Sequence, residues 1–249
     1  NAIAAKTTGV VTATLAADSL SNLGSLTTES TDAITVTVND ADAAALTAAN
    51  LSTLGGKTSG TVTVTNAVAI TGDHDQLTAA LVTAGTKVVV SDATVTVNDV
   101  DTTAITAAEL SAIGGATTGT VTVTNAVAIS GSALEVSNAL VSDATRVVVS
   151  DPTVTINDAD GTALAAIALS SVGAKTTGVV TVTNAVAITG SVAEVTAALV
   201  TAGTLVVVSD AAVTITGNPT ITELNAIAAK TTGVVTATLA ADSLSNLGS

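Results

Sequence analysis

The chain contains no phenylalanine, tryptophan, tyrosine, methionine or cysteine. A core without aromatic side chains has to be filled by valine, isoleucine, leucine and alanine, which suit thin layers that stack on one another. The absence of cysteine excludes a disulfide framework and thiolate chemistry. A chain without readily oxidised side chains also suits exposure to oxidants, and we therefore expect an extracellular protein.

Basic residues are scarce, because 6 Lys and Arg stand against 20 Asp and Glu and give a net charge of −14. This balance excludes nucleic acid as a main partner, since phosphate backbones require clustered basic side chains. No apolar run approaches the ~18 residues of a membrane-spanning helix, so we expect no transmembrane segment.

Histidine and arginine occur once each, as His74 and Arg146. Without cysteine, these residues cannot build a nucleophile–base pair or a recurring zinc site, and we expect no enzyme activity. His74 lies at a polar helix start where the equivalent residues are Ala133 and Val192. The sequence therefore predicts an exposed histidine side chain.

The sequence repeats on a scale of 224 residues, because residues 225–249 are identical to residues 1–25. This identity predicts that the natural chain continues beyond both ends. Residues 1–31 then end a preceding period, and four repeat units follow at 32–91, 92–150, 151–209 and 210–249, the last of them shorter.

Each unit divides into two similar halves that read as strand, corner, strand and helix. Val121 and Val123 alternate with threonine at the period of a strand. Ser132 and Ser191 each precede a glutamate by three positions, which is the signature of a capping box at a helix start. Eight such coils per period contain about 28 residues each, which predicts an α/β solenoid whose coils are stacked into a rod.

The corner after the first strand carries aspartate and asparagine in strict alternation. In a stacked structure, adjacent aspartates would repel one another, whereas an intervening asparagine amide can donate to a neighbouring carboxylate. The alternative is that both residue types merely suit turns. The residues of this predicted corner ladder are Asp32, Asn66, Asp92, Asn125, Asp151, Asn184 and Asp210.

The second strand ends three times in the motif Asn-Asp-x-Asp. Carboxylates at alternate positions can converge on a hard cation, so calcium is the one cofactor that the sequence suggests. The alternative is that these residues cap a helix and favour its positive end. The candidate calcium ligands are Asp40, Asp42, Asp99, Asp101, Asp158 and Asp160.

Two further motifs are weaker. Gly56-Lys57-Thr58 lacks the glycine of a phosphate-binding loop, since Leu51 takes its place, and it follows a helix instead of a strand. Thr-x-Thr stretches such as Thr63-Val64-Thr65 are similar to the faces of ice-binding solenoids, which remains a minor alternative. Valine takes the threonine position in alternate coils, as at Val89, so the lattice of hydroxyl groups is interrupted.

The segment Leu224-Asn225-Ala226-Ile227, which leads to Lys230-Thr231-Thr232-Gly233-Val234-Val235, and the Ile188–Ser191 sequence before a helix carry a resemblance. They resemble the repeats of giant cyanobacterial cell-surface proteins of the swimming-motility type. The resemblance implies an extracellular location, very large size and a structural, adhesive or motility-linked role. It supplies no catalytic residues.

These observations together predict a structural extracellular repeat protein that forms a long rod or a self-assembling filament at a cell surface. We expect self-association and contact with the cell envelope. The alternative function is a calcium-dependent adhesin stalk or a ligand-binding surface array. A filament should associate through its repeats, whereas an adhesin array should stay monomeric.

Overall fold

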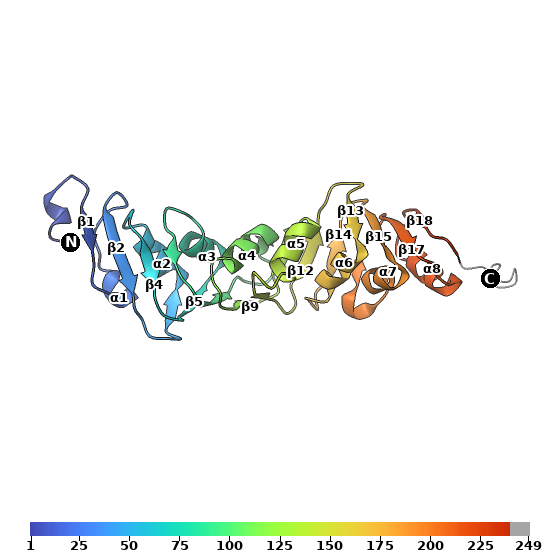
Figure 1. The fold of residues 1–249 in the computed structure, drawn as a ribbon, viewed down its shortest axis with the longest axis horizontal. Helices are drawn as coiled ribbons and strands as arrows, with labels where there is room; N and C mark the ends of the chain where they lie inside the picture. The colour runs from blue at the N-terminus through green and yellow to red at the C-terminus, as the bar shows by residue number, and fades with distance from the viewer. Residues whose placement is uncertain (240–249) are drawn as a thin grey trace. The chain divides into compact units, whose positions relative to one another are not determined.

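The computed structural model of the chain describes residues 1–239. Its strands form four parallel sheets, and the strands alternate with short helices along the chain, which is a repetitive α/β architecture (Figure 1). The residues form two compact units that interleave in sequence. Unit 1 comprises Asn1–Val100, Glu109–Thr124 and Ser142–Val148, and unit 2 comprises Asp101–Ala108, Asn125–Val141 and the residues from Val149 onward.

Unit 1 contains two of the sheets. The first has the order β1-β2-β4-β6 and the second the order β11-β9-β7-β5-β3. Valine pairs with valine across successive strands, as in the series Val36, Val62 and Val88. The strands are β1 (Thr12–Thr14), β2 (Ala33–Val38), β3 (Ala45–Thr47), β4 (Val62–Val64), β5 (Ala69–Gly72), β6 (Val88–Val89), β7 (Thr94–Val97), β9 (Val121–Val123) and β11 (Val147–Val148). The helices are the 3-10 helix η1 (Ala4–Lys6), α1 (Leu20–Leu23), α2 (Ala48–Gly55) and α3 (His74–Leu81), and α2 packs against α3.

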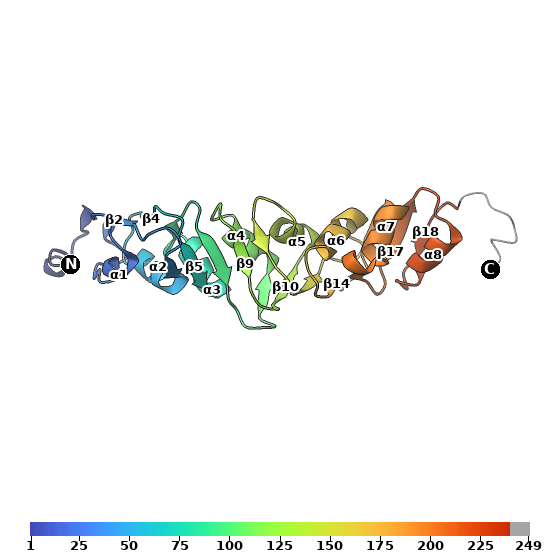
Figure 2. The same ribbon diagram turned by 90° about the horizontal axis from the view of Figure 1, so that it is seen from below.

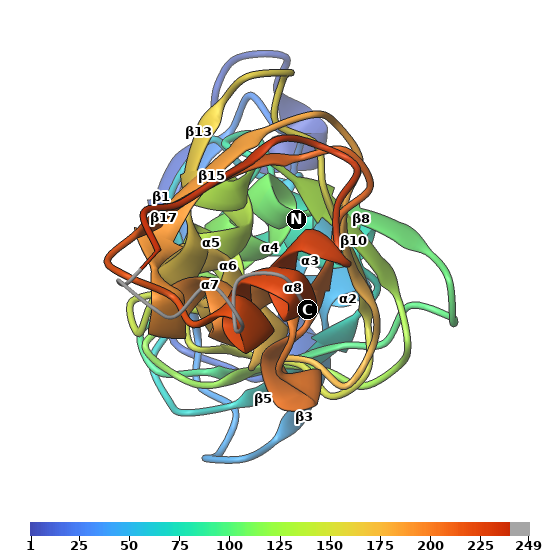
Figure 3. The ribbon, with the colours of Figure 1, turned by 90° about the vertical axis from the view of Figure 1, so that its right-hand side faces the viewer.

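Unit 2 has the same organisation. Its sheets have the orders β16-β14-β12-β10-β8 and β13-β15-β17-β18; β13, β15 and β17 lie side by side in Figure 1 and overlap in the end-on view of Figure 3. The strands are β8 (Ala104–Thr106), β10 (Ala128–Gly131), β12 (Thr153–Ile156), β13 (Ala163–Ala165), β14 (Val180–Val182), β15 (Ala187–Ser191), β16 (Val206–Val207), β17 (Ala212–Thr216) and β18 (Val235–Thr236). The helices are α5 (Ala133–Leu140), α6 (Ala166–Gly173), α7 (Val192–Leu199), the 3-10 helix η2 (Ala202–Thr204) and α8 (Ile221–Ala228). Helix α7 packs against α6 and α8 (Figure 2). Helix α4 (Ala107–Gly114) has residues in both units.

The structure corrects the expectation of two strands before every helix. Two strands precede α3, α5 and α7, but three precede α4 and α6. We call each such run of strands with its following helix a segment. The extra strand β8 lies directly before α4, and in it Ile105 pairs with Ile129 of β10 and is buried.

The core confirms the predicted strand alternation. Val121 and Val123 are buried, while Thr122 between them is half-buried. From the helices, Leu110 and Ile113 contribute fully buried side chains, so branched aliphatic residues fill the interior without aromatics. No helix among residues 1–239 is both long and apolar enough to cross a membrane.

The helix starts also agree with the sequence. Ser132 and Ser191 form the two predicted capping boxes, and a third is formed by Thr220. In each box the glutamate accepts a hydrogen bond from the backbone N–H of the capping residue, which lowers the pKa of that carboxyl, and a bond from the capping side chain adds to this effect. The helices therefore begin where local sequence chemistry places them.

Candidate functional site

The first aspartate of each Asn-Asp-x-Asp motif contacts the start of a helix. The carboxylates of Asp40, Asp99 and Asp158 accept hydrogen bonds from the first backbone N–H of α1, α3 and α5, at 2.7, 2.8 and 2.7 Å. Each helix belongs to the preceding segment, 20 to 25 residues earlier in the chain. The N–H groups of a first helical turn have no partner within the helix and favour a negative charge. These aspartates therefore tie each loop to the helix before it.

The second aspartate of each motif contacts the segment that follows. Asp42, Asp101 and Asp160 accept hydrogen bonds from the backbone N–H of Ala67, Ala126 and Ala185, at 3.1, 3.0 and 3.0 Å. Each loop thus bonds the helix of the preceding segment through its first aspartate and the corner of the following segment through its second. The two carboxylates act on neighbours in opposite directions.

The residue after the second aspartate adopts a left-handed backbone conformation. Its φ angle is 59° at Ala43, 65° at Thr102 and 74° at Gly161. This conformation lets its N–H donate to a carbonyl of the next corner, as Thr102 donates to Ala126 at 2.8 Å. Only glycine adopts it without strain, and a β-branched residue such as Thr102 is strongly disfavoured there.

Two of the corner asparagines bond backbone carbonyls of a neighbouring loop instead of carboxylates. The amides of Asn66 and Asn184 donate to the backbone carbonyls of Asp40 and Asp158, both at 2.6 Å. The backbone carbonyl of each corner asparagine accepts the N–H of the valine two positions later, at 2.9 Å for Asn66, Asn125 and Asn184.

Three of the corner aspartates make local contacts. Asp92, Asp151 and Asp210 each accept the hydroxyl of the preceding serine at 2.8 Å. Asp32 is buried and accepts the N–H of Val11 at 2.8 Å. Asn66 and Asn184 thus bond a neighbouring loop, whereas Asp92, Asp151 and Asp210 bond the adjacent serine and Asp32 bonds both Val11 and its own turn.

The candidate calcium ligands are not gathered into a cluster. Within residues 1–239, no group of three or more His, Cys, Asp or Glu side chains is placed to hold a metal ion. The carboxylates of the three motifs accept backbone N–H groups instead. Calcium requires six to eight oxygen ligands, so this arrangement favours the helix-capping alternative.

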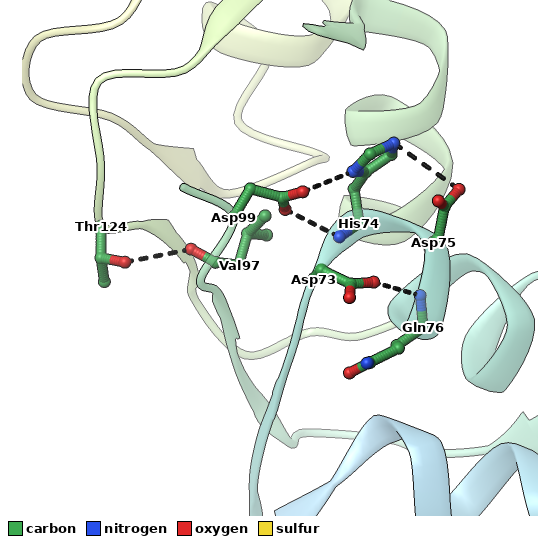
Figure 4. Close-up of polar contacts among 7 residues, drawn as sticks. All are labelled: Asp73, His74, Asp75, Gln76, Val97, Asp99 and Thr124. Carbon is green, nitrogen blue, oxygen red and sulfur yellow. Dashed lines mark hydrogen bonds and ion pairs between the residues drawn. The ribbon is translucent and has the colours of Figure 1, made fainter. Parts of the chain in front are cut away.

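His74 is the first residue of α3, and its backbone N–H is the donor that Asp99 accepts (Figure 4). The structure corrects the expectation of an exposed side chain, because only 14% of it is exposed. Its Nδ1 lies 2.7 Å from Oδ1 of the buried Asp99, whose Oδ2 accepts the His74 backbone N–H, and its Nε2 lies 3.6 Å from Oδ1 of Asp75 (Figure 4). Burial opposes the charge on the ring, but Asp99, Asp75 and Glu109 together outweigh it and raise the pKa of His74 above its ordinary value.

A threonine clasp that sequence reasoning missed joins the loop after every second helix to the segment before it. The hydroxyl of Thr117 donates to the carbonyl of Ala93 at 2.6 Å and accepts the N–H of Gly119 at 3.0 Å. A Cβ atom at Gly119 would overlap the Ala93 carbonyl, which explains the glycine. The same hydroxyl contacts recur at Thr58, Thr176 and Thr231. A recurring Thr-x-Gly after every second helix is the signal in the sequence.

A second set of hydroxyl contacts follows the strands. Thr124 donates to the carbonyl of Val97 at 3.2 Å (Figure 4), and Thr65 and Thr183 make the equivalent bonds at 3.3 Å. The polar residues of the repeat therefore act between segments. Among the contacts described for residues 1–239, many of them bond backbone groups of neighbouring segments.

Comparison of the chain with known protein-family models, with curated proteins and with solved structures finds no match.

Proposed function

We propose that this chain is a section of a structural, extracellular repeat protein that forms a long rod or a self-assembling filament at a cell surface. In this proposal the segments are coils of an α/β solenoid with about 28 residues each. The chain has a mechanical role and no enzyme activity.

One observation carries the proposal, namely that the same contacts recur between neighbouring segments. Val95, Val121 and Val147 follow one another in register in unit 1, as Val154, Val180 and Val206 do in unit 2. Each segment thus pairs with the following segment through the same valine positions through which it pairs with the preceding one. A contact of this kind can be repeated without limit, which is the requirement for a fibrous structure.

The polar contacts support the same interpretation. Asp158, Asp160 and Asn184 are used to join backbone groups that lie 25 or 26 residues apart. A surface that recognised a ligand would keep such side chains for the ligand. The extracellular location rests on the absence of oxidisable side chains and on the family resemblance described above.

Solution scattering tests the rod. A chain carrying one additional 224-residue period is compared with the present chain. Eight stacked coils at the ~4.8 Å spacing of parallel strands would lengthen the particle by roughly 38 Å without widening it. Growth in all directions would contradict the solenoid.

Electron microscopy of the same two proteins, with calcium and with a chelator, separates the two functions. Fibres that persist in the chelator support a structural filament. Monomers that bind a surface only in the presence of calcium would instead support the adhesin alternative.

A further inference from the structure

The outer faces of the sheets carry rows of threonine that the sequence does not reveal. In the second sheet of unit 1, in-register pairing aligns one residue from each strand, in the order Thr47, Thr71, Thr96, Thr122 and Val148. The residue before each of them is buried, so the row itself lies on the outer face of the sheet. We call such a line a threonine row. Unit 2 contains the equivalent row Thr106, Ser130, Thr155, Thr181 and Val207.

The rows correct the expectation that valine interrupts the hydroxyl groups in every second coil. Val89 and Val148 lie 59 residues apart in the sequence. Strands of the row that contains Val148 pair in steps of 24 to 26 residues, so two steps cover at most 52 residues. Strand pairing therefore does not join one valine to the next. Each valine ends a row of its own, and the residues before it in the row all carry hydroxyl groups.

A threonine row presents hydroxyl groups and one apolar side chain that the chain itself does not use. Among the hydrogen bonds described for residues 1–239, none involves the hydroxyls of Thr71, Thr96 or Thr122, whereas the threonines of the clasp bond backbone groups of their own chain. Val148 at the end of the row is 52% exposed, and its equivalent Val207 is 44% exposed. Both kinds of group are therefore available to a partner.

The rows carry no charge, although the chain is strongly acidic. No strand among residues 1–239 contains an aspartate, glutamate, lysine, arginine or histidine, because the charged residues lie in loops and helices. The net charge of −14 makes two copies of the chain repel one another. This repulsion is weakest where two uncharged faces meet, so the sheet faces are the surfaces that suit contact between copies.

A second copy also matches the row in spacing. Neighbouring strands lie ~4.8 Å apart, so a row of five residues is about 19 Å long with one side chain per strand. Two rows with the same spacing stay matched along their whole length, as short identical side chains do between paired sheets. Hydroxyl groups can then bond their counterparts across the contact, and the exposed valine is removed from water.

We propose that two copies of this chain associate side by side through their threonine rows. The inference rests on the proposed function, because it names the face through which the repeat protein self-assembles. One row covers roughly 200 Å², whereas a stable complex buries ~800 Å² on each partner. The present chain therefore associates weakly, and association strengthens where several rows of one chain engage together.

Sedimentation velocity over a wide range of protein concentrations tests the face. Thr96→Glu together with Thr155→Glu places a carboxylate at the third position of each row, and we expect association to weaken roughly tenfold. The matched control, Thr83→Glu with Thr201→Glu, adds the same two charges at exposed positions after α3 and α7. We expect the control to associate like the wild type. Circular dichroism checks that all variants remain folded.

Two further measurements identify the partner. Higher ionic strength screens the repulsion between acidic copies, so we expect it to strengthen association, whereas an interface of ion pairs would weaken. Val148→Thr with Val207→Thr keeps the side-chain shape but removes the apolar end of each row, so association should weaken. If the same substitution left association unchanged and the protein arrested the growth of ice crystals, the rows would bind ordered water and the proposal would be overturned.

The outcomes separate this proposal from the proposed function. Equal association of the two glutamate variants would overturn the threonine rows and leave self-assembly through another surface intact. A wild type that stays monomeric at every concentration would overturn the side-by-side contact as well. The scattering experiment measures elongation within one chain, so its result on the rod does not depend on either outcome.

Discussion

The role of Asp158 leads to a quantitative prediction. Its carboxylate accepts the first N–H of α5 at 2.7 Å, while Ser132 caps the third, so its removal leaves one orphan donor at the positive end of a helix. Loss of a helix-capping acceptor costs about 0.5–2 kcal/mol, and Asp158 is partly exposed. We expect Asp158→Ala to lower the free energy of unfolding by about 1.5 kcal/mol.

Two comparisons isolate the charge and the site. Asp158→Asn keeps an acceptor and loses only the charge at the helix start, so we expect a loss of about 0.5 kcal/mol. Asp210 accepts the hydroxyl of the adjacent Ser209, and Asp210→Ala should cost less than about 0.5 kcal/mol.

The assay is urea unfolding followed by far-ultraviolet circular dichroism, because the chain has no aromatic residue for fluorescence. Each protein is measured with calcium and with a chelator, and the helix-capping role predicts the same differences in both. If calcium raised the unfolding free energy of the wild type but not that of Asp158→Ala, the helix-capping role would be refuted and a metal site supported. Equal stability of Asp158→Ala and wild type would refute the contact with α5.

Three further predictions concern other contacts. Because the pKa of His74 is raised, its protonated pair with Asp99 stabilises the fold fully below about pH 6.5, and this stabilisation is lost as the pH rises through the raised pKa. His74→Ala should therefore flatten the pH dependence of the urea midpoint above about pH 6.5. Thr102→Gly should raise the unfolding free energy by about 1 kcal/mol, because it relieves the strain of a threonine in the left-handed conformation. Gly161→Thr should lower the unfolding free energy, and thermal denaturation measures both changes. Thr117→Val should cost about 1–3 kcal/mol in urea unfolding, because it leaves two backbone groups of the clasp without a partner; an unchanged midpoint would contradict the clasp.

Local chemistry made part of this structure predictable. Val121 and Val123 alternate with threonine because a strand directs successive side chains to opposite faces, and the sequence shows this directly. Ser132 and Ser191 with their glutamates mark helix starts because both partners of a capping box lie within one turn. The parallel α/β pattern follows from strands and helices that alternate along the chain.

The contacts between segments were not predictable in the same way. Strand β8 exists because Ile105 meets Ile129, and nothing within the stretch around Ile105 signals that partner. The sequence offered Asp99 as a metal ligand or a helix cap, but it does not show that the helix is the preceding one or that the His74 ring bonds the same carboxylate. In each case the deciding atom lies about one segment away along the chain, so only the stacking of strands determines the partner.

This distribution of contacts determines how a substitution can act. The loop of Asp158 and Asp160 binds one segment 25 residues before it and another 25 residues after it. The described bonds of these two carboxylates reach no further, so a substitution in the loop weakens two neighbouring interfaces and leaves more distant ones intact. Stability in such an array is a sum of terms for single segments and for adjacent pairs. A section with one damaged loop should therefore open locally at that loop.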